Sequence, residues 1–172
     1  MAWSLKSDSI KMNANLNAFM DALSKLVPFD LLVTSGIRSA RGQASAMFTK
    51  IELGEILTDT YRDQVFARAV MAAYPNLDLA TVAVEEMAAR GGSRHLIGRG
   101  VDLRTRNLST AQRNELKAAI ESMGEYALYE TTPPHMHISL NSKKNYGPMK
   151  WLILAAIVTG GYLWTKKPIR GA

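Results

Sequence analysis

The chain has 172 residues, 47% of them hydrophobic and 21% charged, which fits one folded domain with a small appendage and excludes a disordered chain. Fifteen basic and fifteen acidic residues lie up to residue 142, so the net charge of +6 comes entirely from the last thirty residues. Because a nucleic-acid-binding domain carries its basic residues on a folded face, a charge confined to the tail argues against nucleic acid as a partner.

The N-terminal third contains one predicted helix and one predicted strand. The first residues lack the long apolar segment and cleavage site of a secretory signal, so we expect no export by the ordinary route. Apolar residues at helical spacing predict a helix over 9–26, which ends before Pro28. The run DLLVTS at 30–35 predicts a short strand that ends at Gly36. The following segment, 44–60, has a mixed pattern that fits a loop or lid without requiring one.

The rest of the domain alternates between helices and short strands. Ser109 and Gln112 form a capping box that marks the start of one of these helices. Helical or strand periodicity with turn residues between the elements predicts helices over 61–74, 78–90 and 108–124 and strands over 100–105, 126–130 and 136–140. Because helices outnumber the short strands, we expect an α+β fold, with helices packed on one side of a small antiparallel sheet.

The C-terminal thirty residues differ from the rest of the chain. Residues 143–150 are polar and basic and predict a linker. Fifteen uncharged, mostly apolar residues follow at 151–165, and as a helix they would be about 22 Å long. A bilayer core is about 30 Å thick, so a buried core helix is an alternative. Lysines on both sides and aromatic residues at both ends favour a transmembrane anchor in a lipid bilayer, followed by a basic tail at 166–172.

All three histidines of the chain lie in two short motifs, SRHLIGRGVDLRT and PPHMHISL. Strand alternation directs His135 and His137 to the same face of the second motif. The chain has no cysteine, so a metal ion would need imidazole and carboxylate ligands. We therefore expect His95, Asp102 and His137 to bind a zinc ion with one position left for water, and His135 to lie beside them. Each motif alone is also typical of an ordinary polar loop.

These two motifs, with VTSGIRSARGQ at 33–43, resemble those of zinc peptidases of the D-alanyl-D-alanine carboxypeptidase and dipeptidase group. The wider set of that group includes lysostaphin-type enzymes and the hedgehog domain. The resemblance extends over roughly residues 30–140. It implies a hedgehog-like or D-Ala-D-Ala-peptidase-like zinc peptidase domain over 1–142. The zinc ligands implied by position are His95, Asp102 and His137.

The resemblance also implies roles for other side chains. Arg38 matches the arginine that the family places against substrate and transition state, and Gln43 and Ser93 match motif positions that contact substrate or support the structure. Many members carry an acidic general base three positions before the last ligand, where this chain has Pro134. The base is therefore open between Glu130 and His135, and Glu130 is slightly favoured.

Two smaller departures accompany this one. Gly100 stands where the family motif usually has alanine, and Ile37 replaces a common aromatic residue.

The resemblance implies a peptidoglycan hydrolase that cleaves a peptide bond in the stem peptide, either as an endopeptidase or as a D,D-carboxypeptidase. Because the chain combines an expected anchor with no secretory signal, the hypothesis is a bacteriophage lytic enzyme attached to an internal membrane of the virion and used in genome entry. Its partners would then be peptidoglycan, lipid and other virion proteins. The alternatives are a catalytically silent, metal-stabilised binding protein and a structural membrane protein of the virion.

Overall fold

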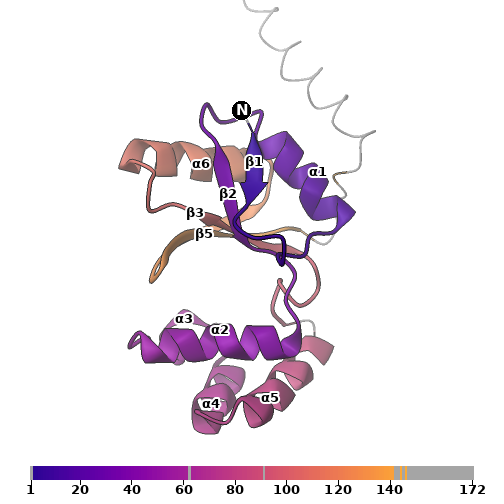
Figure 1. The fold of residues 1–172 in the computed structure, drawn as a ribbon, viewed down its shortest axis with the longest axis vertical. Helices are drawn as coiled ribbons and strands as arrows, with labels where there is room; N and C mark the ends of the chain where they lie inside the picture. The colour runs from indigo at the N-terminus through magenta and orange to yellow at the C-terminus, as the bar shows by residue number, and fades with distance from the viewer. Residues whose placement is uncertain (1, 62, 91, 142–143, 145, 147–172) are drawn as a thin grey trace, which may run out of the picture.

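The computed structural model of the chain describes residues 2–61, 63–90, 92–141, 144 and 146. Within them the fold is α+β, as expected, with one mixed five-stranded sheet and helices in two groups (Figure 1). The strands are β1 (Trp3–Leu5), β2 (Leu31–Ser35), β3 (Gly100–Arg104), β4 (Tyr126–Thr131) and β5 (Pro134–Ser139). The helices are α1 (Ala14–Leu23), α2 (Ala40–Glu52), α3 (Leu57–Thr60), α4 (Gln64–Ala73), α5 (Leu77–Ala89) and α6 (Thr110–Ser122).

The sheet has the strand order β1-β2-β3-β5-β4 and is not purely antiparallel. Strand β1 pairs with β2 in parallel, while the pairs β2–β3, β3–β5 and β4–β5 are antiparallel. The expectation of an antiparallel sheet is therefore wrong at this edge, because β1 was not predicted. Its three residues, Trp3–Leu5, are too few to show the alternation that identifies a strand.

One face of the sheet packs on α1 and α6 (Figure 1). Apolar residues of β3, β4 and β5 alternate toward this face and form a core with the apolar side of α1. The largest fully buried members include Leu103, Ile138, Phe19 and Leu116. Burial of this core is the main force that holds the strands in register.

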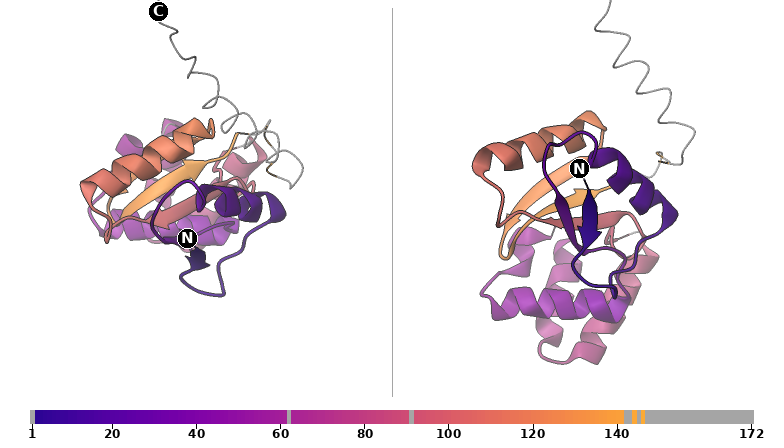
Figure 2. Two further views of the ribbon diagram at one scale, coloured as in Figure 1. Left: turned by 90° about the horizontal axis from the view of Figure 1, so that it is seen from above. Right: turned by 45° about the horizontal axis from the view of Figure 1, so that its top comes forward.

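The other helices form a second unit with its own core, on the opposite side of the sheet from α1 and α6 (Figures 1 and 2). Met47 and Phe48 of α2, Phe66 of α4 and Val84 of α5 meet in this core. The expectation that all helices pack on one side is therefore wrong. Periodicity shows that a helix has an apolar face, but it does not show which apolar surface that face meets.

Most of the segment 44–60, which fitted a loop or lid, is helical. Helix α2 begins after Ser39, whose side chain accepts a hydrogen bond from the backbone N–H of Gly42. Gln43, Ala44, Met47 and Phe48 are buried along one side of the helix. The alternating polar residues of this stretch obscured that apolar stripe in the sequence.

The end of the folded unit lies beyond the expected boundary at residue 142. Tyr146, expected in the linker, is buried and packs edge-to-face on Phe19, with ring centroids 5.3 Å apart. The expected anchor at 151–165 and the basic tail at 166–172 lie outside the described residues. Among the helices that the structure does describe, none has the length and apolarity needed to span a membrane.

Candidate metal centre

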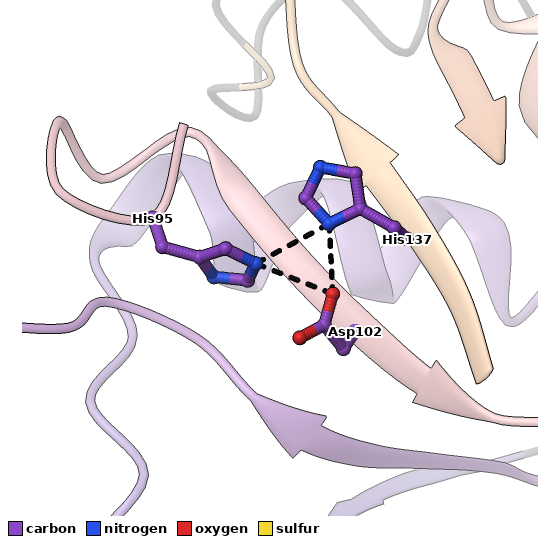
Figure 3. Close-up of side chains that lie close together, drawn as sticks. All are labelled: His95, Asp102 and His137. Carbon is purple, nitrogen blue, oxygen red and sulfur yellow. Dashed lines mark hydrogen bonds and ion pairs between the residues drawn. The ribbon is translucent and has the colours of Figure 1, made fainter. Parts of the chain in front are cut away.

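Three side chains from separate segments meet in a group that could hold a metal ion (Figure 3). His95 lies on the loop before β3, Asp102 lies on β3, and His137 lies on β5. Asp102 and His137 are direct neighbours in the antiparallel β3–β5 register, so the sheet itself brings them together. The structure thus brings together the three residues that the sequence predicted as ligands.

The distances between the candidate ligand atoms are short. The Nε2 atom of His95 lies 3.2 Å from Oδ1 of Asp102 and 3.3 Å from Nδ1 of His137. The Nδ1 atom of His137 lies 2.8 Å from the same Oδ1 atom. His95 and Asp102 are each only 4% exposed. Two imidazole nitrogens and one carboxylate oxygen therefore converge on one small volume.

Hydrogen bonds on the outer side of each ring fix its orientation. His95 Nδ1 lies 2.6 Å from the carbonyl oxygen of Gly36. A carbonyl only accepts, so this nitrogen carries the hydrogen and Nε2 keeps its lone pair in the neutral ring. His137 Nε2 lies 3.1 Å from the hydroxyl of Ser139, which leaves its Nδ1 atom directed at Asp102. Such outer partners are typical of metal-binding histidines.

The loop that carries His95 can approach β3 only because residue 100 is glycine. A Cβ atom at Gly100 would lie 2.7 Å from the backbone nitrogen of His95 and 2.9 Å from the carbonyl carbon of Arg94. Both contacts are to backbone atoms, so no side chain could move to relieve them. The glycine that departs from the family motif is therefore required by the local packing.

Asp102 is held in its ionised form. Burial alone would raise the pKa of its carboxyl group, but when the His95 ring is protonated its charge, with hydrogen bonds from His137 and from that ring, holds this pKa well below the usual value. Its second oxygen, Oδ2, accepts a hydrogen bond from Arg38 Nη2 at 2.8 Å. Arg38 is itself fixed by Ser35 and Gln43. Asp102 is thus ready to act as an anionic ligand at neutral pH.

The group lies in a cleft of about 1340 Å³ between the sheet and the α2–α5 unit. Register and strand alternation place nine residues on this face of the sheet, in three rows across β3, β5 and β4, and all of them except Gly100 line the cleft. The rows are Arg104, His135 and Glu130; then Asp102, His137 and Leu128; then Gly100, Ser139 and Tyr126. The metal group occupies the middle row, so the cleft continues past it in both directions along the strands.

His135 and Glu130, the two candidates for the general base, are neighbours in the first row. His135 Nδ1 lies 2.6 Å from the carbonyl oxygen of Pro133 and so carries the hydrogen of the neutral ring. Its Nε2 atom lies 3.9 Å from Asp102 Oδ1 and 3.6 Å from Glu130 Oε2. Glu130 Oε2 also forms a close ion pair with Lys50 of α2. The Nε2 atom of His135 therefore lies between Glu130 and Asp102 of the metal group, and Glu130 also has Lys50 as a cationic partner.

The helical wall of the cleft contributes residues that the sequence did not single out. Lys50 forms ion pairs with Glu55 and Glu130. Burial alone would lower the pKa of Lys50, but the hydrogen bond and charge of Glu130 raise it above its usual value. Tyr61 stacks edge-to-face on Phe66, and burial raises the pKa of its phenol. No local sequence pattern marks these residues, because each is a single polar side chain on a helix or turn.

The other two predicted site residues, Gln43 and Ser93, lie at separate places along the cleft. Gln43 is buried, accepts from Arg38 and donates to the hydroxyl of Tyr61 at 3.5 Å. It therefore supports Arg38 in the structure. Ser93 lines the cleft beside the His95 loop, where its backbone carbonyl accepts from Leu96.

No protein-family model, curated protein or solved structure matches this chain.

Proposed function

We propose that this chain is a zinc-dependent hydrolase that cleaves a peptide bond in the stem peptide of peptidoglycan. The observation that carries the proposal is the convergence of His95 Nε2, Asp102 Oδ1 and His137 Nδ1 in an open cleft, with His135 Nε2 directed at them. The motif resemblance supplies the substrate class. Within that resemblance, the fold would be of the hedgehog or D-Ala-D-Ala-peptidase type.

The three ligand atoms fit zinc. In a tetrahedral zinc site with nitrogen and oxygen ligands, neighbouring ligand atoms lie about 3.3 Å apart. Two of the separations here are 3.2 and 3.3 Å, and the third is 2.8 Å. Two imidazoles and one carboxylate, with access from a cleft, are a donor set of catalytic zinc sites. When bound, zinc supplies Lewis acidity, which polarises a peptide carbonyl and makes water a better nucleophile near neutral pH.

His135 is favoured over Glu130 as the general base, which reverses the order expected from the sequence. The lone pair of His135 Nε2 faces the metal group and can take the proton of the attacking water. The carboxylate of Glu130, 3.6 Å away, stabilises the imidazolium that results. The same His135 then donates this proton to the leaving amine.

Arg38 has a different role from the one implied by the family. Its guanidinium donates to Asp102, Ser35 and Gln43. These contacts use three of its five N–H donors, and through them Arg38 orients the ligand carboxylate and holds it ionised.

The location of the enzyme rests on sequence alone. The apolar stretch at 151–165 with flanking lysines supports a C-terminal membrane anchor, and a lytic enzyme tethered to an internal phage membrane would open the cell wall during genome entry. Proteomics and protease mapping of purified particles test this part. Detection inside the membrane fraction supports it, and absence from the particles contradicts it without affecting the proposed reaction.

The reaction itself is tested by hydrolysis of purified peptidoglycan with the zinc-loaded full chain and its variants. We expect His135→Ala to lower kcat by about 100-fold or more while zinc stays bound. Glu130→Gln should lower kcat less, by about tenfold, because His135 would still be present to take the proton from the attacking water. Glu115→Gln, on the exposed side of α6, is the matched control. Zinc binding without hydrolysis in the parent chain would favour the alternative, a metal-stabilised binding protein.

A further inference from the structure

Arg104 lies in the cleft at the side of His135 opposite to Glu130. It is the last residue of β3 and pairs with His135 across the β3–β5 register, so both side chains share the wall that carries the metal group. Cross-strand neighbours of this kind lie about 5 Å apart at their Cβ atoms. A cation therefore stands directly beside the proposed general base.

Within the described residues, Arg104 makes no side-chain hydrogen bond or ion pair. Two other basic residues close to the metal group are engaged, since Arg38 pairs with Asp102 and Lys50 pairs with Glu130 and Glu55. The carboxylates on that wall are thus already neutralised by other groups. Among the described residues the charge of Arg104 has no partner, although its side chain lines the cleft and is half-buried.

Three further cations without an ion-pair partner among the described residues line the same cleft. Arg106 follows two residues after the end of β3, and Lys6 follows β1, which lies two strands away in the sheet. Arg94 lies next to His95 on the loop before β3. All three side chains are exposed, and none has an ion-pair partner in the part of the chain that the structure describes. With Arg104, these are four positive charges along one cleft that lack an ion-pair partner among the described residues, and they produce a potential that attracts an anion.

We propose that Arg104, assisted by Arg106 and Lys6, binds a carboxylate of the peptide substrate next to the scissile bond. This inference rests on the proposed function and names the substrate feature that the site recognises. Arginine binds carboxylates through two parallel N–H donors, and a half-buried guanidinium gains more from such a partner than an exposed one. Arg38 is less suited to this site, because Asp102 neutralises its charge and three of its five N–H donors are engaged by Asp102, Ser35 and Gln43.

The sheet geometry limits where the carboxylate stands in the substrate. The rows of Arg104 and Asp102 are separated by two residues along β3, or about 7 Å. An extended peptide covers about 3.5 Å per residue. The recognised carboxylate therefore belongs to a residue within about two positions of the bond that is cut. Amidation of that carboxylate would remove the charge that Arg104 binds.

The test compares two synthetic stem tetrapeptides that each contain one internal glutamate residue and differ only in whether the α-carboxylate of this residue is free or amidated. Their dissociation constants are measured by calorimetry with the full chain in mild detergent, loaded with zinc and carrying His135→Ala to prevent turnover. We expect the free carboxylate to bind about tenfold more tightly than the amide. Adding Arg104→Gln should reduce this preference to less than twofold, and Arg104→Lys should retain part of it.

Arg68→Gln is the matched control, since Arg68 is an exposed arginine of α4 outside the cleft. Equal affinity for both peptides in the parent, no binding of either peptide, or a preference that survives Arg104→Gln would each overturn the carboxylate subsite. The proposed function is judged separately, by hydrolysis of peptidoglycan with the unsubstituted chain. Hydrolysis without a carboxylate preference contradicts only the subsite, and a carboxylate preference without hydrolysis contradicts only the reaction.

Discussion

Arg38 and Asp102 lie 64 positions apart in the sequence, and their side chains meet at 2.8 Å between Nη2 and Oδ2. The other oxygen of Asp102 faces both histidines of the metal group. One carboxylate thus links the segment after β2 to the candidate ligands. Arg38 therefore acts on the metal group through Asp102.

Replacing Arg38 should weaken metal binding. Arg38→Met removes the donor that holds Asp102 Oδ2, so the carboxylate can rotate and loses a neutralising partner. Loss of such an outer partner costs about 10- to 100-fold in metal affinity. Competition with a zinc-binding dye measures the effect. Arg41→Met, at an exposed ion pair with Asp78, is the control, and equal zinc affinity in both variants would remove Arg38 from the account of the site.

Gly100→Ala should displace the His95 loop. The new Cβ would lie 2.7 Å from the backbone nitrogen of His95, and overpacking of this kind costs about 2 kcal/mol. Urea unfolding should show this loss of stability, and competition with a zinc-binding dye should show weaker zinc binding. Gly42→Ala in α2 is the matched control, because its Cβ meets only the Ser39 hydroxyl and the edge of Arg38. A Gly100→Ala protein as stable as the Gly42→Ala protein would contradict the close approach.

Lys50 should matter for stability as well as for the site. Its side chain is 13% exposed and pairs with Glu55 and Glu130, which are 20% and 17% exposed. Lys50→Met would leave two carboxylates with little access to water and no cation, at a cost of about 3 kcal/mol. The double variant Lys50→Met with Glu130→Gln should recover part of this loss. If the double variant is no more stable than Lys50→Met, the Lys50–Glu130 pair does not connect the helical unit to the sheet.

Tyr146 should make stability fall at alkaline pH. Burial and the hydrogen bond that its hydroxyl donates to Glu125 raise the pKa of Tyr146 well above its usual value near 10. A raised pKa favours the neutral form in the folded state, so this contribution is complete below pH 10 and is lost as pH rises above it. At pH 8 the free energy of unfolding of Tyr146→Phe should be about 2 kcal/mol lower than that of the parent chain. Between pH 9 and 11 this free energy should fall less in the variant than in the parent. Tyr126→Phe, which changes an exposed ring, is the control. If the free energy of unfolding of Tyr146→Phe falls with pH as steeply as that of the parent, the prediction is contradicted.

The sequence predicted the features that repeat locally or lie in short motifs. Ser109 and Gln112 form the expected capping box, because a cap depends only on residues within one turn. The strands that carry Asp102 and His137 begin and end within two residues of their expected bounds. The metal group could be predicted because the chain has only three histidines, which form two motifs.

Other features depend on contacts between distant segments and could not be predicted. Strand β1 forms because its three residues pair with the edge of β2. Helix α2 was not predicted because its buried residues are interspersed with polar ones. The positions of Arg104 and Lys50 in the cleft follow from strand register and from the packing of the helical unit. A single charged residue gives no sign in the sequence of which carboxylate it meets.

The most direct test of the account is the zinc content of the full chain, measured by mass spectrometry beside its His137→Ala variant. The full chain is needed because Tyr146 belongs to the core. We expect about one zinc per chain in the parent and in an exposed-site control, Asp8→Ala, and close to none in His137→Ala. A folded parent that holds no zinc after incubation with the metal would contradict the account, and His95, Asp102 and His137 would then be a buried hydrogen-bonded cluster.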